Sequence, residues 1–218
     1  MLETWFDPAA IAIVFAGTLA ATLLRCGLAD CRIALAALSG LFDKPFDPAQ
    51  AKAELSVQVR EIADDGFLRA EPRRFGDSEF DSLSDLIINQ RSIQSLHGEH
   101  AKFADARLAH AQTAMRVFDN AAELAPVLGL AGTLVALAQA PGASAQDSGL
   151  VGAIAMAVIT TLYGLVAANF FFAPIGSAIG RKSRKEERDR EAVLEWLEEG
   201  IRSTGAATSA AQPASHAA

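Results

Sequence analysis

The chain has 218 residues, of which 51% are apolar and 21% charged, with a formal net charge of −7. This negative balance argues against a nucleic-acid partner, which needs a basic face. Cys26 and Cys31 are too few for a disulfide framework, so we expect reduced thiols near a cytoplasmic boundary. The first residues are acidic, whereas a secretory signal opens with basic ones, so the apolar run after them is expected to be a retained helix.

Three long windows contain no Asp, Glu, Lys or Arg: residues 8–24, 124–146 and 148–180. A helix needs about 17–25 residues to cross the hydrocarbon core of a membrane, and helices are the only open-chain structures stable there. We therefore predict an all-α membrane protein with three transmembrane helices. The alternative, a hairpin buried in a soluble core, is disfavoured by the length of the third window.

The region between the first two windows is polar and helical in pattern. Asp47 and Pro48 are a helix start signal, and one or two long helices then run into the second window. No strand pattern is convincing. The predicted segments are a first transmembrane helix (1–26), a cytoplasmic helical domain (27–122), a transmembrane hairpin (123–180), a cytoplasmic helix (181–202) and a disordered tail (203–218).

The basic residues indicate the orientation in the membrane. Six Lys or Arg lie in "RKSRKEERDR" (181–190), and Arg25 and Arg32 follow the first window, whereas "APGASAQDSG" (140–149) has none. We therefore predict a multi-pass protein of the cell inner membrane. The N-terminus and the loop between the second and third windows would lie outside, and the C-terminus in the cytoplasm.

Enzyme chemistry has no clear basis in the sequence. His97 and His100 have a spacing that can bind a metal on a helix, but no third ligand is evident. No nucleophile elbow, phosphate loop or cysteine cluster is recognisable. We expect no catalytic residues, no metal site and no cofactor.

Threonines interrupt the second and third windows. Thr133 lies in "GLAGT", and Thr160 and Thr161 lie in "TTLYG". A threonine can simply bond the carbonyl one turn back, but these are flanked by glycines and alanines, which let helices approach closely. The glycines expected at this packing interface are Gly129, Gly132 and Gly164. The two windows predict a packed hairpin that presents hydroxyls, and any ion path would need a charged group from another chain.

Three segments together resemble the MotA/TolQ/ExbB ion-channel family. "APVLGLAGTLVALAQA" and "AIAMAVITTLYGLVAANFFFAPI" resemble its two pore-facing helices, and "FDPAAIAIVFAGTLAATLL" is similar to the helix preceding the cytoplasmic domain of MotA-type flagellar stator proteins. The match covers roughly residues 5–201. MotA proteins have a further first helix and a longer C-terminus, and a three-helix count is that of TolQ and ExbB.

The resemblance implies a stator subunit that couples H⁺ or Na⁺ flow to flagellar rotation. It implies a homo-oligomer, five copies around two copies of a MotB-like or ExbD/TolR-like partner that supplies a transmembrane aspartate. The alternatives are a TolQ/ExbB-like energiser of envelope processes and a non-conducting membrane scaffold. By position, the resemblance assigns three threonines to the ion route: Thr133, Thr160 and Thr161. It assigns Pro126 and Pro174 to hinges that couple ion flow to motion. It also implies a possible rotor contact at Arg73, Arg74 and Glu79, which a solvated face would equally explain.

Overall fold

The computed structural model describes residues 8–65, 76–90, 93–138 and 148–210. Every regular element in these ranges is a helix, as the sequence predicts, and no strand occurs among them. The elements are α1 (Pro8–Gly40), α2 (Pro48–Asp65), α3 (Ser78–Gln90), α4 (Ile93–Ala138), α5 (Ser148–Val166), the π-helix η2 (Ala167–Phe172) and α6 (Ala173–Ala210).

The chain forms two compact units. The first comprises residues 1–43 and 109–182, and the second comprises residues 44–108 and 183–218. Helices α4 and α6 each contribute residues to both units. We call them the membrane unit and the polar unit.

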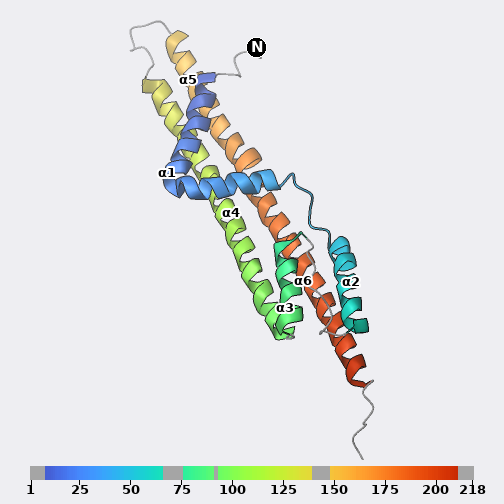
Figure 1. Cartoon of the computed structure of the whole chain (residues 1–218). Coiled ribbons are helices and arrows are strands. Elements are labelled where there is room, and N and C mark those ends of the chain that lie inside the picture. The colour runs from blue at the N-terminus through green and yellow to red at the C-terminus, as the bar shows by residue number, and fades with distance from the viewer. Residues whose placement is uncertain (1–7, 66–75, 91–92, 139–147, 211–218) are drawn as a thin grey trace, which may run out of the picture. The chain divides into compact units, whose positions relative to one another are not determined.

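Helix α1 bends sharply within the membrane unit (Figure 1). Gly27 has φ 83°, a conformation that residues with a Cβ rarely adopt, and it separates two straight stretches of helix. The second stretch packs Ala34 against Val117 and Phe118 of α4 and Ile179 of α6. The end of α1 is held by Lys182, whose ammonium group donates to the carbonyl oxygens of Gly40 and Asp43, so that it satisfies a carbonyl left free at a helix end.

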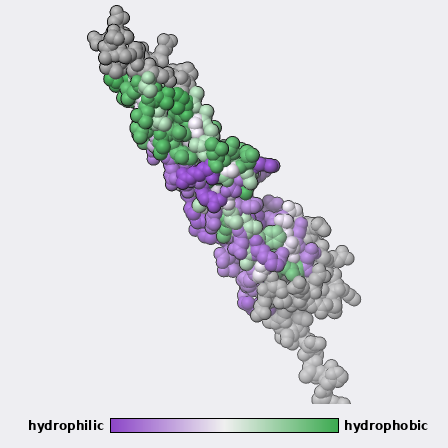
Figure 2. All heavy atoms as spheres, turned by 90° about the vertical axis from the view of Figure 1, so that its left-hand side faces the viewer, coloured by the Kyte–Doolittle hydropathy of each residue, from purple (hydrophilic) through white to green (hydrophobic). Residues whose placement is uncertain are grey.

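Three stretches of helix are long and apolar enough to cross a membrane: Ala10–Gly40, Leu96–Ala138 and Val151–Ser203. Figure 2 shows apolar side chains gathered over one stretch of the surface. Large apolar residues of α1, α4 and α5 are exposed, among them Leu24 at 87%, Leu134 at 64% and Val158 at 64%. Such exposure is expected of helices that lie against lipid or another chain.

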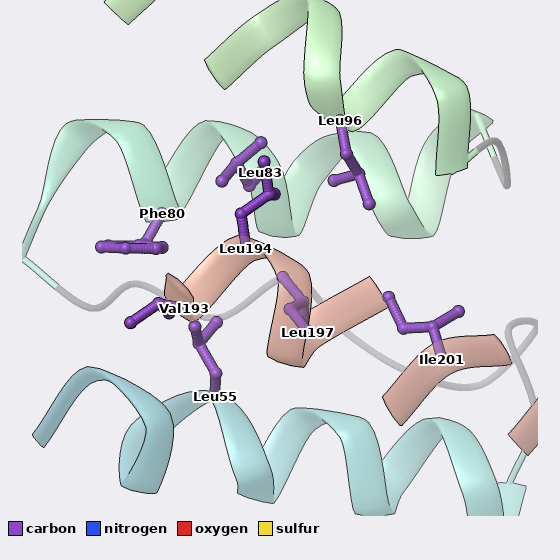
Figure 3. Close-up of a cluster of buried hydrophobic side chains, with 8 residues drawn as sticks. All are labelled: Leu55, Phe80, Leu83, Leu96, Val193, Leu194, Leu197 and Ile201. Atoms are coloured by element: carbon purple, nitrogen blue, oxygen red, sulfur yellow. The ribbon is translucent and has the colours of Figure 1, made fainter. Parts of the chain in front are cut away.

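The polar unit has a small apolar core of its own (Figure 3). Leu55 of α2 meets residues from α3, α4 and α6. Asp47 caps α2, because its carboxylate accepts hydrogen bonds from the backbone N–H groups of Ala49 and Gln50, and this confirms the predicted helix start. The buried core residues are Leu55, Phe80, Leu83, Leu96, Val193, Leu194, Leu197 and Ile201.

The helix bounds differ from the predicted segments. Helix α1 continues beyond residue 26 to Gly40, and α4 is one continuous helix across residue 123. Helix α6 extends to Ala210, beyond residue 202, where the predicted cytoplasmic helix ends. The points at which the chain enters and leaves the membrane stay predictions.

Candidate functional site

Helices α4 and α5 approach closely at the three predicted glycines, Gly129, Gly132 and Gly164. A Cβ atom at Gly129 would lie 2.8 Å from the carbonyl oxygen of Thr160, and one at Gly164 would lie 2.6 Å from that of Ala125. At Gly132 the nearest atom would be Cβ of Thr160, at 3.1 Å. No side chain fits at the first two positions without displacing a helix, so the hairpin depends on these glycines.

Thr160 lies inside this contact. Its side chain is fully buried, and its hydroxyl donates to the carbonyl oxygen of Ala157 at 3.0 Å. Because Gly132 faces it directly, the hydroxyl is not accessible from outside the chain. The structure therefore gives Thr160 a packing position between α4 and α5, which does not favour the predicted place on an ion route.

Thr133 and Thr161 remain partly exposed on the hairpin. The Thr161 hydroxyl donates to the Ala157 carbonyl oxygen at 3.2 Å, and the Thr133 hydroxyl donates to that of Leu130 at 2.6 Å. Each proton is used within its own helix, so each hydroxyl oxygen keeps lone pairs for a group outside the chain. This arrangement suits contact with a cation, and the roles of both residues on an ion route stay predictions.

The two prolines predicted as hinges occupy different local structures. Pro126 lies inside the continuous helix α4, and its Cα would be 3.1 Å from a Cβ at Gly164. Pro174 follows η2, in which the N–H of Ala173 bonds the carbonyl of Ala168, five residues back. Pro174 has no N–H for the usual helix hydrogen bond to the carbonyl four residues back, and the wider turn before it makes room for its ring. Their part in transmitting motion is untested.

Polar contacts join α1 to α4 on both sides of the Gly27 bend. Arg25 pairs with Glu123 at 3.1 Å, and on the other side Asp30 pairs with Arg116 at 2.7 Å. Between them the amide of Asn120 donates to the Cys26 sulfur at 3.2 Å. The α4 partners 116, 120 and 123 share one helix face, so α4 holds the bend in place. Cys26 and Cys31 are free thiols, as expected.

Glu79 is the centre of an ion cluster in the polar unit. Its side chain is 1% exposed, and its carboxylate contacts Arg107 and His100 of α4 and Arg190 of α6. Arg107 also reaches Glu187 at 2.9 Å. A buried carboxylate needs such partners, because an unpaired charge would be strongly destabilising. Glu79 therefore joins three helices internally, a position that does not favour a rotor contact.

Arg190 and Asp77 form the edge of this cluster. The Arg190 guanidinium lies over the ring of Phe46, with its central carbon 4.5 Å from the ring centroid, and bonds Asp77 at 2.8 Å. Burial alone would raise the pKa of Asp77, but the hydrogen bond and the charge of Arg190 bring it below its ordinary value. Burial alone would lower the pKa of Arg190, but the hydrogen bond to Asp77 and the negative charge of Asp77 raise it above its ordinary value.

The other predicted positions are distributed as follows. Arg73 and Arg74 lie outside the described residues. His97 does not join His100 at a common site: it pairs with Glu198 at 3.0 Å, whereas His100 lies between Glu79 and Glu187. Among the described residues no group of three or more His, Cys, Asp or Glu is arranged to hold a metal ion. The sequence offered no signal for the Glu79 cluster, because its members are far apart in the chain.

These features define a helical membrane protein built on a glycine-packed hairpin with hydroxyls along it. The chain belongs to the MotA/TolQ/ExbB proton channel family, whose model matches residues 70–192. The resemblance seen in the sequence is thereby confirmed.

Individual relatives point in the same direction. Motility protein A of Cereibacter sphaeroides is 30% identical over 148 residues, which are 66% of this chain and 56% of that protein, so the chain spans little more than half of its length. Chemotaxis protein PomA of Vibrio alginolyticus is 25% identical over 88% of this chain and 76% of its own. The flagellar MotAB stator complex from Bacillus subtilis shares the fold, with a TM-score of 0.81, 21% identity and coverage of 91% of this chain and 79% of that one.

Proposed function

We propose that the chain is a subunit of an ion-driven stator that powers flagellar rotation. The observation that carries this proposal is the α4–α5 hairpin, where glycine packing leaves the Thr133 and Thr161 hydroxyls partly exposed in an uncharged stretch of helix. The family membership and the relatives named as motility proteins support the motor over an envelope energiser or an inert scaffold.

The hairpin alone is an incomplete ion path. Residues 124–146 and 148–180 contain no carboxylate or basic side chain, whereas a cation crossing hydrocarbon needs a compensating charge. A MotB-like partner would supply a transmembrane aspartate, and several copies of this chain, five by the family resemblance, would surround it. The ion would be H⁺ or Na⁺, since hydroxyl and carbonyl oxygens serve either.

Orientation follows from charge. By the positive-inside rule, the basic run beginning at Arg181 predicts that the C-terminal part of α6 lies in the cytoplasm. The segment between α4 and α5 has no Lys or Arg and is predicted to lie outside. This topology predicts that a cysteine at Ser144 is labelled by an impermeant reagent from outside the cell. A cysteine at Arg202, whose side chain is 64% exposed, would be labelled only after the membrane is opened. Labelling of both from outside would overturn the three-helix topology.

The function is tested by co-expressing the chain with a MotB-like protein. Purified complex in vesicles is expected to carry an ion current that depends on the partner's transmembrane aspartate, and the pair is expected to restore swimming to a stator-deficient strain. The matched control is the same complex with that aspartate changed to asparagine. A complex that assembles and conducts neither ion, with or without the aspartate, would contradict the proposal.

A further inference from the structure

Asn169 is an exposed polar side chain on an otherwise apolar face. It lies in η2, beyond α5, and the residues around it on the surface are large and apolar. Leu165 is 47% exposed, Phe170 75% and Phe171 52%. An amide on a face turned to lipid would lose its hydration without compensation, so this position needs a polar surrounding from outside the chain.

The hydrogen bond that Asn169 makes fixes which end of its amide is free. Its Nδ2 donates to the carbonyl oxygen of Leu165 at 2.9 Å. A carbonyl only accepts, so the NH₂ end must face the helix and Oδ1 must face away from it. No described residue donates to Oδ1. The chain therefore presents a neutral, unpaired carbonyl-type oxygen outward from an apolar face.

Asn169 repeats the arrangement of Thr161. Thr161 bonds the carbonyl of Ala157, four residues back, and Asn169 bonds that of Leu165, also four residues back. Positions 157, 161, 165 and 169 follow one ridge of the helix, because residues four apart are neighbours on its surface. Eight residues correspond to about 12 Å along the axis. The ridge thus carries two outward oxygens, with Asn169 nearer the basic end at Arg181.

The π-helix contributes to this placement. Residues 167–172 are wound more widely than an α-helix, and this stretch ends two residues before Pro174. The wider turn rotates the side chains within it relative to regular helix, and single π turns are frequent at functional sites. In this chain it surrounds Asn169, so the local geometry that accommodates Pro174 also directs the Asn169 amide.

We propose that Asn169 Oδ1 contacts the monovalent cation in transit, as a second oxygen on the route past Thr161 and toward the basic end of the helix. This inference rests on the proposed function. A neutral amide oxygen replaces part of the hydration shell of Na⁺, or accepts a hydrogen bond from hydronium, and releases the ion more readily than a carboxylate would.

The first test compares ion flux through vesicles containing the complex with its partner. Asn169→Leu keeps the size and removes the oxygen, and we expect its flux to fall about tenfold or more with partner co-purification unchanged. Phe170→Leu, the neighbouring exposed position, is the matched control and should conduct as the native chain. Separate proton and sodium gradients show which ion the oxygen serves. Native flux in Asn169→Leu, or loss of the partner from that variant, overturns the inference.

The second test uses cysteine reactivity and needs no ion current. In a Cys26→Ser, Cys31→Ser background, Asn169→Cys should react with a water-soluble thiol reagent in the assembled complex, and Phe170→Cys should react at least tenfold more slowly. An unreactive cysteine at position 169, with normal native flux, overturns the inference and leaves the proposed function standing. A native complex that conducts neither ion overturns the proposed function, and the inference with it.

Discussion

Gly164 lies so close to Ala125 that a Cβ atom on it would be 2.6 Å from the Ala125 carbonyl oxygen. The obstacle is backbone and cannot rotate away, so Gly164→Ala must push α4 and α5 apart. Overpacking of this kind costs about 1–3 kcal/mol. We expect a lower melting temperature for the detergent-solubilised chain, measured by circular dichroism.

Gly152 is the matched control for this prediction. It lies in the same helix, and no atom would come within 4 Å of a Cβ there. Gly152→Ala should leave the melting temperature unchanged or raise it slightly, since alanine favours helix by about 0.5–1 kcal/mol. Equal melting temperatures for Gly164→Ala and the native chain would show that the hairpin does not depend on this contact.

Removal of the Glu79 charge should destabilise the polar unit strongly. Glu79→Gln leaves Arg107 and Arg190 beside a neutral group in a site where the native side chain is 1% exposed. Losing one partner of a buried ion cluster costs about 3–5 kcal/mol. The change in the free energy of unfolding is measured by urea unfolding. The probe is the fluorescence of Trp196, which packs against this core. A Trp5→Phe background removes the other tryptophan.

The control for the Glu79 experiment is an exposed pair on the same unit. Glu199 and Arg202 are 3.6 Å apart with side chains 74% and 64% exposed. Because such pairs contribute little, Glu199→Gln should unfold at the native urea concentration. If Glu79→Gln did the same, the cluster would be irrelevant to the stability of this unit.

The sequence predicted the all-helical fold, for a physical reason. Long uncharged windows and closely spaced glycines are local patterns, and hydrocarbon allows few alternatives to helix. The sequence could not show which of Thr160 and Thr161 is buried. Neighbouring residues point about 100° apart on a helix, and only the position of Gly132 in the structure shows that Thr160 is the covered one.

Long-range contacts escaped prediction for the opposite reason. Glu79 looked like a surface charge in "RRFGDSEF", yet its partners Arg107 and Arg190 are 28 and 111 residues away. Nothing in the local pattern distinguishes a buried hub from a solvated face. The Gly27 bend was equally hidden, since a single glycine in an apolar run does not reveal a positive φ.

Acid should weaken the polar unit partly through Asp77. Its pKa is lowered in the folded chain by Arg190, despite burial, so its carboxylate stabilises the fold above the ordinary value near 3.8. That contribution is lost as the pH falls from there through the folded pKa. In urea titrations, Asp77→Asn should be less stable than the native chain at pH 7, and this loss of stability should become smaller as the pH falls below the ordinary value.

Asp85, an exposed carboxylate of α3, the helix that begins directly after Asp77, supplies the control for the acid prediction. Asp85→Asn removes a negative charge of equal size without touching Arg190. It should follow the native pH profile. A native profile in Asp77→Asn as well would mean that the Asp77–Arg190 contact at 2.8 Å contributes nothing to the acid response.

The hydroxyl of Thr161 should matter for ion transport and little for folding. Thr161→Val keeps the shape and removes an oxygen that is partly exposed on the hairpin, while the lost bond to Ala157, 3.2 Å long, is an internal one. A hydrogen bond to a charged group contributes about 1.5–3 kcal/mol. We therefore expect partner-dependent ion flux or swimming to fall roughly ten- to a hundredfold, with native amounts of assembled complex.

Two other threonines make the Thr161 experiment decisive. Thr18 is fully buried in α1 and bonds the Val14 carbonyl at 2.6 Å, so Thr18→Val repeats the chemical change at a position where no ion can reach the hydroxyl. Thr160→Val repeats it one residue from Thr161, inside the α4–α5 contact. Both should keep their flux per assembled complex within about twofold of native, since neither loses an accessible oxygen.

If all three variants conducted alike, the partly exposed hydroxyl of Thr161 would serve only its hydrogen bond to the helix backbone and would have no part in ion transport. If Thr160→Val alone lost flux, the ion route would have to pass through the packed hairpin, where Gly132 now leaves no room for it.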